Sequence, residues 1–536
     1  MIFREVAMNN KLFLYLTGFF AGMSVMAVEL AASRLLAPYF SSSQIVWTII
    51  IGTIMIAMAL GNIYGGKSAD KDPGPGKLYT RILIAAIWIG AIPVLGKYII
   101  LGISALLILT VDSNFLIIAA FAACMLIFVF PLFLLGTVTP SLAKYSVESL
   151  SDSGKTVGTL GAFNTIGSII GTFVPTFITI PSVGTNITLL IFSGILIILC
   201  LVYFAGSKSF KKKTTISVII FAICVTTGSS DSFVFWKSGL AYEGESVYNY
   251  LQVKESDNNV ILSTNVLFGV QSVYMKDEGL TGMYYDYALA APLMAAGNGK
   301  NTKDLEVLVL GMGTGTYALQ CRKYFGDIMV EGVEIDEKIT WLSKKYFHLP
   351  DNINVTTYDG RAFLNAIDKK YDVIMVDAYQ DITIPFQMSS IEFFTSVKNH
   401  LKDNGVMVVN MNMHDESEGN INQYLSDTIS SVFSEVYTVN VGQSTNRELF
   451  ASCNPDIQNI FSENINILKN YELKLLMSEL KNNISKYNPG NYILTDDKAP
   501  VELLGIKVID NLIQKEAAYY KGILKKDGIK GLLNSF

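Results

Sequence analysis

A glycine-rich turn and the acid that follows it are the first residues whose types and spacing fit ligand chemistry. The turn, Gly311-Met312-Gly313-Thr314-Gly315, directly follows an apolar run at 305–310. Glycine suits such a turn because the backbone can bend sharply and approach a ligand with no Cβ in the way. Glu334 comes 21 residues after Gly313, at the end of the next apolar run, where a carboxylate accepts hydrogen bonds from a ribose diol. These residues indicate a nucleotide site and fit nicotinamide dinucleotides and S-adenosyl-methionine equally.

Two further acids follow the next two apolar runs. Asp359 and Gly360 come after residues 353–358, where an acid accepts a hydrogen bond from an adenine amino group and glycine leaves room for the ring. Asp377 ends the following run and is placed for charge stabilisation or for work as a general base. The loop after it passes through Pro385, and such a loop can close over a substrate and exclude water.

The elements that position these residues are short buried strands that alternate with helical stretches. Such alternation predicts an α/β, Rossmann-like domain at 301–536 with a mostly parallel sheet of seven strands, and ligands bind such sheets at the carboxyl ends of the strands. An appended small antiparallel sheet is predicted at 237–300, from β-rich segments at 246–254, 259–264 and 270–275. The predicted strands of the main sheet are Leu305–Leu310, Ile328–Val333, Ile353–Tyr358, Val373–Asp377, Val406–Met411 and two more near 435–441 and 448–453.

Composition separates the chain into two halves that favour different solvents. Of its 536 residues, 51% are hydrophobic and only 16% are charged, against about 25% charged in ordinary soluble proteins. Residues 1–228 hold 14 Lys and Arg against 7 Asp and Glu, whereas the remainder holds 27 against 39. The net charge of −5 argues against a nucleic-acid partner. None of the five cysteines has paired spacing, so we expect no disulfide framework and no metal site.

The first half predicts an α-helical, multi-pass membrane domain at 1–230. Seven runs are apolar enough for helices that cross or enter a bilayer, at 12–33, 45–66, 82–111, 114–137, 159–180, 187–206 and 214–228. Pro93 and Lys97 interrupt the run 82–111, which is either one kinked helix or a hairpin of two. The prediction is therefore about seven spans, with eight as the alternative.

Basic residues in short loops give an orientation, because cytoplasmic loops are rich in Lys and Arg. Two groups mark cytoplasmic loops, Lys67, Lys71, Lys77 and Arg81, and then Lys208, Lys211, Lys212 and Lys213. A seventh span would place the acidic half outside the cell, although an adenosyl cosubstrate is made in the cytosol. We therefore expect an integral protein of the cell membrane with a cytoplasmic catalytic domain. Then either 214–228 does not cross or 82–111 crosses twice.

The motifs in their order resemble the spermidine synthase (polyamine aminopropyltransferase) family, and in particular its members fused to a membrane domain. The resemblance covers nearly the whole chain. It is carried by the segments 245–248, 267–271, 284–286, 311–315, 333–336, 359–360, 371–374, Asp377, 494–497 and 499–500, and in the first half by Glu29, Arg34, Pro38, Gly167 and Gly171.

By this resemblance, the protein is a transferase of polyamine biosynthesis. It moves the aminopropyl group of decarboxylated S-adenosyl-methionine to an amine of the putrescine and polyamine class, and methylthioadenosine leaves. Asp377 is implied as the catalytic base. The implied cosubstrate site comprises Asn249, Gly311, Gly313, Thr314, Glu334, Asp359, Gly360 and Pro385. The implied amine site comprises Tyr284, Tyr285, Gln380 and Asp381.

Several positions depart from the family pattern. Thr314 stands where the family has an Asp that binds the amine of the decarboxylated cosubstrate, so intact S-adenosyl-methionine is an alternative. Asn249 replaces a Gln, Tyr285 replaces a His or Gln, and the second acid of the loop moves from Gln380 to Asp381.

Three hypotheses follow from these motifs. The first is the aminopropyltransferase, and the second is a methyltransferase or another enzyme that cleaves the sulfonium of S-adenosyl-methionine. The third is a transporter whose soluble domain senses an adenosyl ligand or a polyamine. The expected partners are a small amine and the lipid bilayer, with a homodimer as an open alternative.

Overall fold

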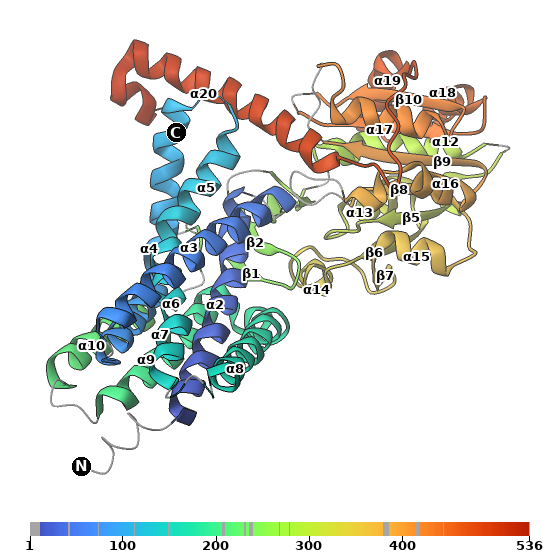
Figure 1. Ribbon diagram of the computed structural model, residues 1–536. Helices are drawn as coiled ribbons and strands as arrows, with labels where there is room; N and C mark the ends of the chain where they lie inside the picture. The colour runs from blue at the N-terminus through green and yellow to red at the C-terminus, as the bar shows by residue number, and fades with distance from the viewer. Residues whose placement is uncertain are drawn as a thin grey trace.

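The computed structural model has a bundle of long helices beside an α/β part, as Figure 1 shows. The residues that the structure describes are 11–40, 43–72, 74–111, 113–147, 149, 151, 153–205, 210–229, 232–234, 239–266, 269–277, 279–297, 299–378, 385–412, 417–442 and 444–534.

Each of the predicted apolar runs lies in a helical segment of the bundle. The helices are α2 (Lys11–Phe40), α3 (Gln44–Lys71), α4 (Gly76–Thr110), α5 (Phe115–Ile127), α6 (Val129–Gly136), α7 (Val138–Ser146), α8 (Ser153–Val174), α9 (Ile180–Ala205) and α10 (Phe210–Gly228). The run 82–111 lies in the single helix α4, which contains Pro93, so the alternative of a hairpin is wrong. At Gly184 the backbone leaves helical geometry with a φ of 82°, which separates α8 from most of α9.

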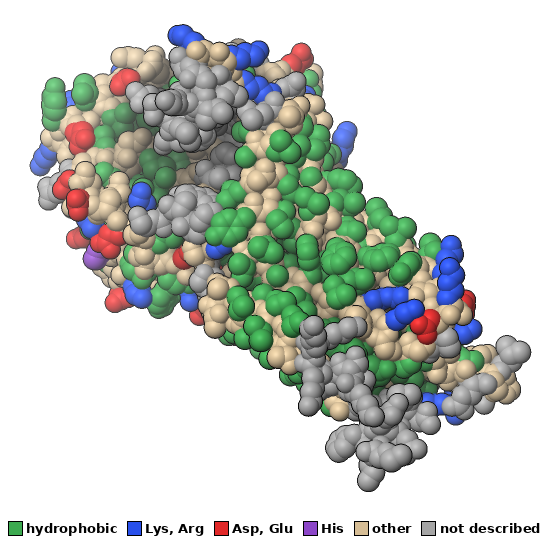
Figure 2. Space-filling model, turned by 90° about the vertical axis from the view of Figure 1, so that its left-hand side faces the viewer, with side chains coloured by type: hydrophobic (Ala, Val, Ile, Leu, Met, Phe, Trp, Pro, Cys, Tyr) green, Lys and Arg blue, Asp and Glu red, His purple; other side chains and the backbone are tan. Residues whose placement is uncertain are grey.

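Within the part of the chain that the structure describes, four helical segments are long and apolar enough to cross a membrane, or five if the bent pair formed by α5 and α6–α7 is one span. Helix α10 contributes a shorter apolar stretch, Thr214–Gly228. Many large apolar side chains of the bundle are exposed, for example Met55 at 66%. Figure 2 shows them as a broad hydrophobic surface, with Lys and Arg near one end.

Helix α2 packs closely against α8 because two glycines of α8 face its backbone. A Cβ at Gly167 would lie 2.0 Å from the Phe19 carbonyl oxygen, and one at Gly171 would lie 2.0 Å from that of Met23. These glycines therefore serve close helix packing, as their spacing predicts.

The two ends of the bundle differ in what they contact. At one end, Lys144 forms a 2.8 Å ion pair with Asp70, and the ring centroids of Tyr79 and Tyr203 lie 3.8 Å apart. These contacts join the end of α7 to the end of α3, and the start of α4 to the end of α9. The basic residues Lys67, Lys71, Lys77 and Arg81 are at this end, as is the start of α10, which carries Lys211, Lys212 and Lys213; Lys208 lies outside the described residues.

The α/β part is attached at the other end. The Pro38 carbonyl accepts a 3.0 Å hydrogen bond from Val266 N–H, and Glu245 accepts bonds of 2.6 Å and 2.7 Å from the backbone N–H and hydroxyl of Thr185. The C-terminal helix α20 (Val501–Asn534) also contacts this end, because Asp510 accepts hydrogen bonds from the N–H groups at the start of α5.

A four-stranded antiparallel sheet follows the bundle, in the order β1 (Leu240–Glu245), β2 (Tyr250–Glu255), β3 (Asn259–Ser263) and β4 (Ser272–Met275). The β-rich segment predicted at 246–254 contains most of β2, but its first four residues are not part of a strand. Residues Ser246–Asn249 form the turn between β1 and β2, in which the Ser246 hydroxyl accepts hydrogen bonds from the N–H groups of Tyr248 and Asn249.

Over the described residues the main sheet has eight strands, in the order β12-β10-β11-β9-β8-β5-β6-β7, one more than predicted. Strands β5 to β9 are parallel, and β9–β11, β11–β10 and β10–β12 pair antiparallel. This is the Rossmann-like methyltransferase arrangement that the alternation predicts. The strands are β5 (Glu306–Leu310), β6 (Met329–Glu334), β7 (Asn354–Thr357), β8 (Tyr371–Val376), β9 (Leu401–Met411), β10 (Glu435–Asn440), β11 (Arg447–Ser452) and β12 (Ser485–Lys486).

Helices cover both faces of this sheet. They are α11 (Tyr284–Ala288), α12 (Ala290–Ala295), α13 (Thr316–Phe325), α14 (Glu337–Tyr346), α15 (Gly360–Ala366), α16 (Ile391–Asn399), α17 (Ile421–Ser430), α18 (Ile457–Ile467) and α19 (Tyr471–Asn483).

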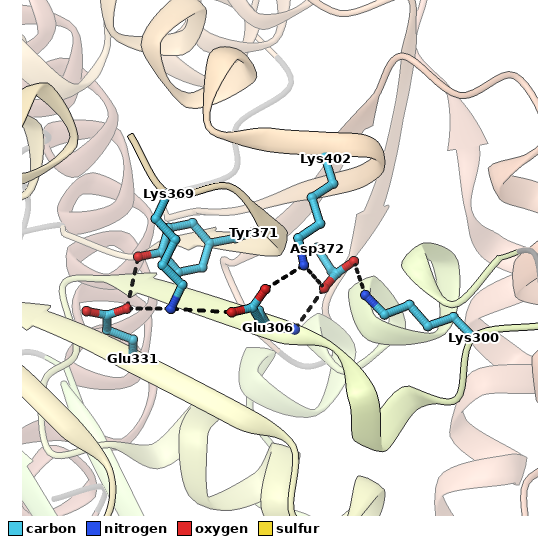
Figure 3. Close-up of polar contacts among 7 residues, drawn as sticks. All are labelled: Lys300, Glu306, Glu331, Lys369, Tyr371, Asp372 and Lys402. Atoms are coloured by element: carbon cyan, nitrogen blue, oxygen red, sulfur yellow. Dashed lines mark hydrogen bonds and ion pairs between the residues drawn. The ribbon is translucent and has the colours of Figure 1, made fainter. Parts of the chain in front are cut away.

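An ion-pair cluster joins β5, β6 and β8 at the edge of the sheet where they begin (Figure 3). Asp372, 8% exposed at its side chain, accepts hydrogen bonds from Lys300, Lys402 and the backbone N–H of Glu306. Burial alone would raise the pKa of Asp372, but the bonds from both lysines hold it below its usual value. Asp372 therefore has a structural role, at the edge of the sheet opposite the glycine turn.

Candidate active site

The glycine turn after β5 brings the backbone against the end of β8. Gly311 has a φ of 86°, and a Cβ there would lie 2.4 Å from the carbonyl oxygen of Asp377. Gly313 and Gly315 also have positive φ, and α13 begins at Thr316 directly after the turn. The turn therefore requires glycine for both conformation and close approach.

Glu334 lies at the end of β6 beside this turn. Its carboxylate accepts hydrogen bonds from the N–H groups of Gly313, at 2.8 Å, and Asp336, at 3.0 Å. Only 7% of Glu334 is exposed, and burial raises its pKa to about 7 although the two N–H groups oppose the rise. A carboxyl held in this way can accept hydrogen bonds from a ligand's hydroxyl groups once it is ionised.

Asn249 reaches the site from the small sheet. Its amide donates a 2.8 Å hydrogen bond to Asp336, whose carboxylate also accepts one of 2.5 Å from the Ser246 hydroxyl. Asp336 is buried, and the sequence motif that contains it gave no reason to single it out. It ties the β1–β2 turn to the end of β6.

Asp359 and Gly360 follow β7. Asp359 caps α15, because its carboxylate accepts a 2.8 Å hydrogen bond from Ala362 N–H, and Gly360 is the first residue of that helix. Asp359 and Glu334 follow or end neighbouring strands and both line the cavity described below.

Asp377 directly follows β8, and two neighbours hold its carboxylate. The Tyr284 hydroxyl donates a 2.7 Å hydrogen bond to one oxygen, and the Asn410 amide donates a 3.2 Å bond to the other. Burial raises the pKa of Asp377 to about 7; the two hydrogen bonds oppose this rise and the negative charge of Glu334 adds to it. A carboxyl that titrates near neutral pH is suited to general-base work.

Tyr284 and Tyr285 stand at the start of α11 with ring centroids 4.0 Å apart. The Tyr285 hydroxyl donates a 2.7 Å hydrogen bond to the Gln271 carbonyl. Burial, and then the negative charge of Asp377, raise the pKa of both hydroxyl groups far above their usual value, so both are neutral donors.

These residues surround a cavity of about 370 Å³ at the carboxyl ends of the parallel strands. Of the residues singled out from the sequence, its lining contains Asn249, Tyr285, Gly311, Gly313, Glu334, Asp359, Gly360, Asp377 and Pro385. Tyr284 lies behind Asp377 and outside the lining. Thr314 is fully buried, also outside the lining, and its N–H donates to the Ser272 hydroxyl at 3.2 Å.

The rim of the cavity includes residues that no motif identified. Gln44, the first residue of α3, and Glu502, in the first turn of α20, both line it, and Gln44 N–H donates a 2.8 Å hydrogen bond to Glu502. The helical half therefore contributes to the site. Gln380 and Asp381 lie outside the described residues.

Comparison with known proteins gives the family. The spermine/spermidine synthase domain matches residues 289–458. The probable polyamine aminopropyl transferase of Bifidobacterium longum is 51% identical over 352 residues, which are 62% of this chain and 78% of that protein. The polyamine aminopropyltransferase of Vibrio vulnificus is 27% identical over 242 residues, 44% of this chain and 78% of that protein.

Among solved structures, a probable spermidine synthase from Corynebacterium glutamicum aligns with a TM-score of 0.36 and 17% identity, over 48% of this chain and 97% of that one. The identity and coverage of the Bifidobacterium relative, together with the domain match, are sufficient to assign a family. The chain belongs to the spermine/spermidine synthase family of polyamine aminopropyltransferases, and it is a transferase.

Proposed function

We propose that this cavity transfers an aminopropyl group from decarboxylated S-adenosyl-methionine to an amine, with Asp377 as the base. The observation that carries the proposal is the placement of Asp377. Its carboxyl titrates near neutral pH, lines the cavity and is oriented by Tyr284 and Asn410.

The reaction begins with the loss of a proton, because an ammonium ion has no lone pair with which to attack. Asp377 takes a proton from the acceptor ammonium. The amine nitrogen then attacks the aminopropyl carbon that is bonded to the sulfonium sulfur. The carbon–sulfur bond breaks, its electron pair goes to sulfur, and neutral methylthioadenosine leaves. Exclusion of water from the cavity favours the step, since the charge on sulfur disappears as the charge on nitrogen forms.

The other residues predicted from the sequence are assigned to binding, although Tyr284 and Thr314 lie outside the cavity lining. Glu334 accepts hydrogen bonds from the ribose, Asp359 and Gly360 hold the adenine, and Asn249, Gly311, Gly313, Thr314 and Pro385 complete the cosubstrate site. Tyr284 and Tyr285, with Gln380 and Asp381 of the loop after Asp377, hold the acceptor.

Intact S-adenosyl-methionine is the second candidate cosubstrate, because Thr314 is neutral where the family carries an Asp. Purified protein should be given each cosubstrate with putrescine and longer amines, and methylthioadenosine and S-adenosylhomocysteine should be quantified. Methylthioadenosine that forms only with the decarboxylated compound and an amine supports the proposal. S-adenosylhomocysteine would instead identify a methyltransferase, and loss of turnover in Asp377→Asn with cosubstrate binding retained tests the base.

We further propose that residues 1–230 form a domain that crosses the cell membrane, followed by the small sheet at 237–300 and the catalytic domain at 301–536. The exposed apolar side chains of the bundle and the lengths of its helices support this arrangement. A homodimer stays a prediction.

The side of the membrane on which the catalytic domain lies is open to a direct test. The basic turns lie at one end of the bundle, whereas the contacts of Pro38, Thr185 and Asp510 attach the catalytic half at the other. If the basic turns are cytoplasmic, as the distribution of Lys and Arg favours, the catalytic half is outside the cell. The expectation of a cytoplasmic catalytic domain, which rests on where the cosubstrate is made, is the alternative.

Cys453 reports the side, since it is exposed and the other four cysteines are buried. A membrane-impermeant maleimide applied to intact cells labels Cys453 if the catalytic half is outside. Lys71→Cys, in a Cys453→Ser background, marks the basic end and should then stay unlabelled until the cells are opened. The reverse pattern would place the catalytic half in the cytosol.

A further inference from the structure

Glu448, in β11, is a fully enclosed carboxyl that the proposed mechanism does not use. It is 0% exposed, and neither of its carboxylate oxygens has a hydrogen-bond partner among the described residues. Leaving a buried polar group unpaired costs several kcal/mol, so nearly all such groups are paired. A carboxyl kept in this state needs an explanation outside the packing of the core.

The register of the sheet places Glu448 in one row with Asp377. Glu448 is directly opposite Asn410 in the antiparallel pair of β11 and β9. Val409 pairs with Val376 in the parallel pair of β9 and β8, so Asn410 is beside Asp377, and their side chains hydrogen-bond. Paired residues point to the same face and strands are about 4.8 Å apart, so the backbones of Asp377 and Glu448 are roughly 10 Å apart on one face.

Among the described residues, the groups that face Glu448 are acidic or neutral. Asp377 faces it from β8 and Asn410 from β9, while Tyr317 of α13 is close enough to feel its charge. Helix α11, which carries Tyr284, packs against β9 and β11. The neighbouring Arg447 directs its Nε–H to Asn440, at 2.7 Å. Burial, and then the charge of Asp377, hold the pKa of Glu448 well above its usual range, so the carboxyl is neutral when no cation is beside it.

An ammonium group beside Glu448 would change this balance. A cation within about 4–6 Å favours the ionised carboxylate, which then accepts hydrogen bonds from the N–H donors of the ammonium. An enclosed ion pair of this kind is strong because water does not compete for either partner. The row of Asp377 and Glu448 would thus offer two carboxyls to a ligand with more than one amine.

We propose that Glu448 is a buried anchor for an alkylammonium group at the inner end of the active site. The proposal rests on the proposed function, because the ammonium belongs to one of its two substrates. One source is the far amine of a diamine acceptor. The other is the aminopropyl amine of the decarboxylated cosubstrate, whose usual acidic partner is replaced by Thr314. Glu448 lies outside the cavity lining, on the same face of the sheet as Asp377.

The test is Glu448→Gln, which removes the charge and keeps the shape. Binding of putrescine, butylamine, decarboxylated and intact S-adenosyl-methionine to the full chain should be measured by calorimetry, with KM and kcat where turnover occurs. If Glu448 anchors the acceptor, the substitution lowers the affinity for putrescine by about tenfold or more. The affinity for butylamine, which has a single amine, then changes by less than about twofold. If Glu448 anchors the cosubstrate, only the affinity for decarboxylated S-adenosyl-methionine falls by that factor. Unchanged affinity for all four ligands overturns the proposal.

A second readout separates ligand binding from a structural role. Ionisation of Glu448 on binding releases a proton, so the heat of binding in wild type depends on the buffer, and this dependence decreases in Glu448→Gln. Glu435→Gln on β10, which removes a carboxylate paired with Lys486 at 2.8 Å, is the matched control and should change neither affinity nor proton release. If wild type forms no methylthioadenosine, the proposed function fails, while the calorimetric comparison still decides the role of Glu448.

Discussion

Removing the proposed base should make the ligand-free protein more stable, and the gain should depend on pH. The pKa of Asp377 is raised from 3.8 to about 7, mainly by burial. An acid whose pKa is higher in the folded state loses stability as pH rises between its unfolded and folded pKa values. Asparagine stays neutral, so Asp377→Asn should match wild type near pH 4 and exceed it increasingly up to about pH 7.

The size of the gain follows from the pKa. A difference of about 3 units corresponds to about 4 kcal/mol at most, at 1.36 kcal/mol per unit. Because Asp377 lines an open cavity, solvent screens its charge, and we expect about half of this, ~2 kcal/mol. The melting temperature of the detergent-solubilised protein should then rise by about 4–8 °C at pH 8.

Scanning fluorimetry of wild type and variant from pH 4 to pH 8 measures this difference. Asp372→Asn, at the other end of the same strand, is a control of opposite sign. The pKa of Asp372 is lowered by its lysines, so its loss should destabilise the protein by a similar amount throughout pH 4 to 8, because this contribution declines only below the unfolded pKa of about 3.9. A gain for Asp377→Asn that is the same at pH 4 and pH 8 would refute the reasoning.

Three further substitutions test the site. Glu334→Gln should lower the affinity for adenosyl ligands, measured by calorimetry, by about 10–100-fold. It should also move the acidic limb of the kcat/KM profile to lower pH, because the negative charge that raises the pKa of Asp377 is gone. Tyr284→Phe removes a hydrogen bond that lowers the pKa of Asp377, so that limb should move to higher pH by about one unit; an unchanged profile would contradict the assignment. Gly311→Ala should lower the free energy of unfolding by about 1–2 kcal/mol for its positive φ alone, and further for the contact with the Asp377 carbonyl. The melting temperature should fall and ligand binding should be lost. A stable variant that still binds ligand would show that the turn can shift.

The residues at the strand ends could be located from sequence, because parallel strands all end at one edge of the sheet. Gly311, Glu334, Asp359 and Asp377 each follow an apolar run, and the structure brings them to one cavity. The resemblance to a known family then supplied expected roles for Asn249 and the tyrosines of α11.

What spacing does not reveal is register between strands far apart in the chain. Asn410 is in β9 beside Asp377, and Glu448 is in β11 opposite Asn410, so only the pairing of these strands shows that the three residues share one face. The error at 246–254 has a similar origin, since local β-propensity does not distinguish a strand from a polar turn held by the hydroxyl of Ser246. Gln44 precedes the apolar run 45–66 and no motif contains it, because its place in the lining depends on the docking of two distant parts of the chain.

The hydrogen bond between Gln44 and Glu502 has a practical consequence for anyone who wishes to study the catalytic half by itself. A truncated protein that begins after α10 would keep every strand-end residue but would lack Gln44 in the lining of its pocket. Kinetic constants from such a fragment would describe an enzyme with a wider opening to its cavity. A preference for short or long amines measured on the fragment would not hold for the intact protein.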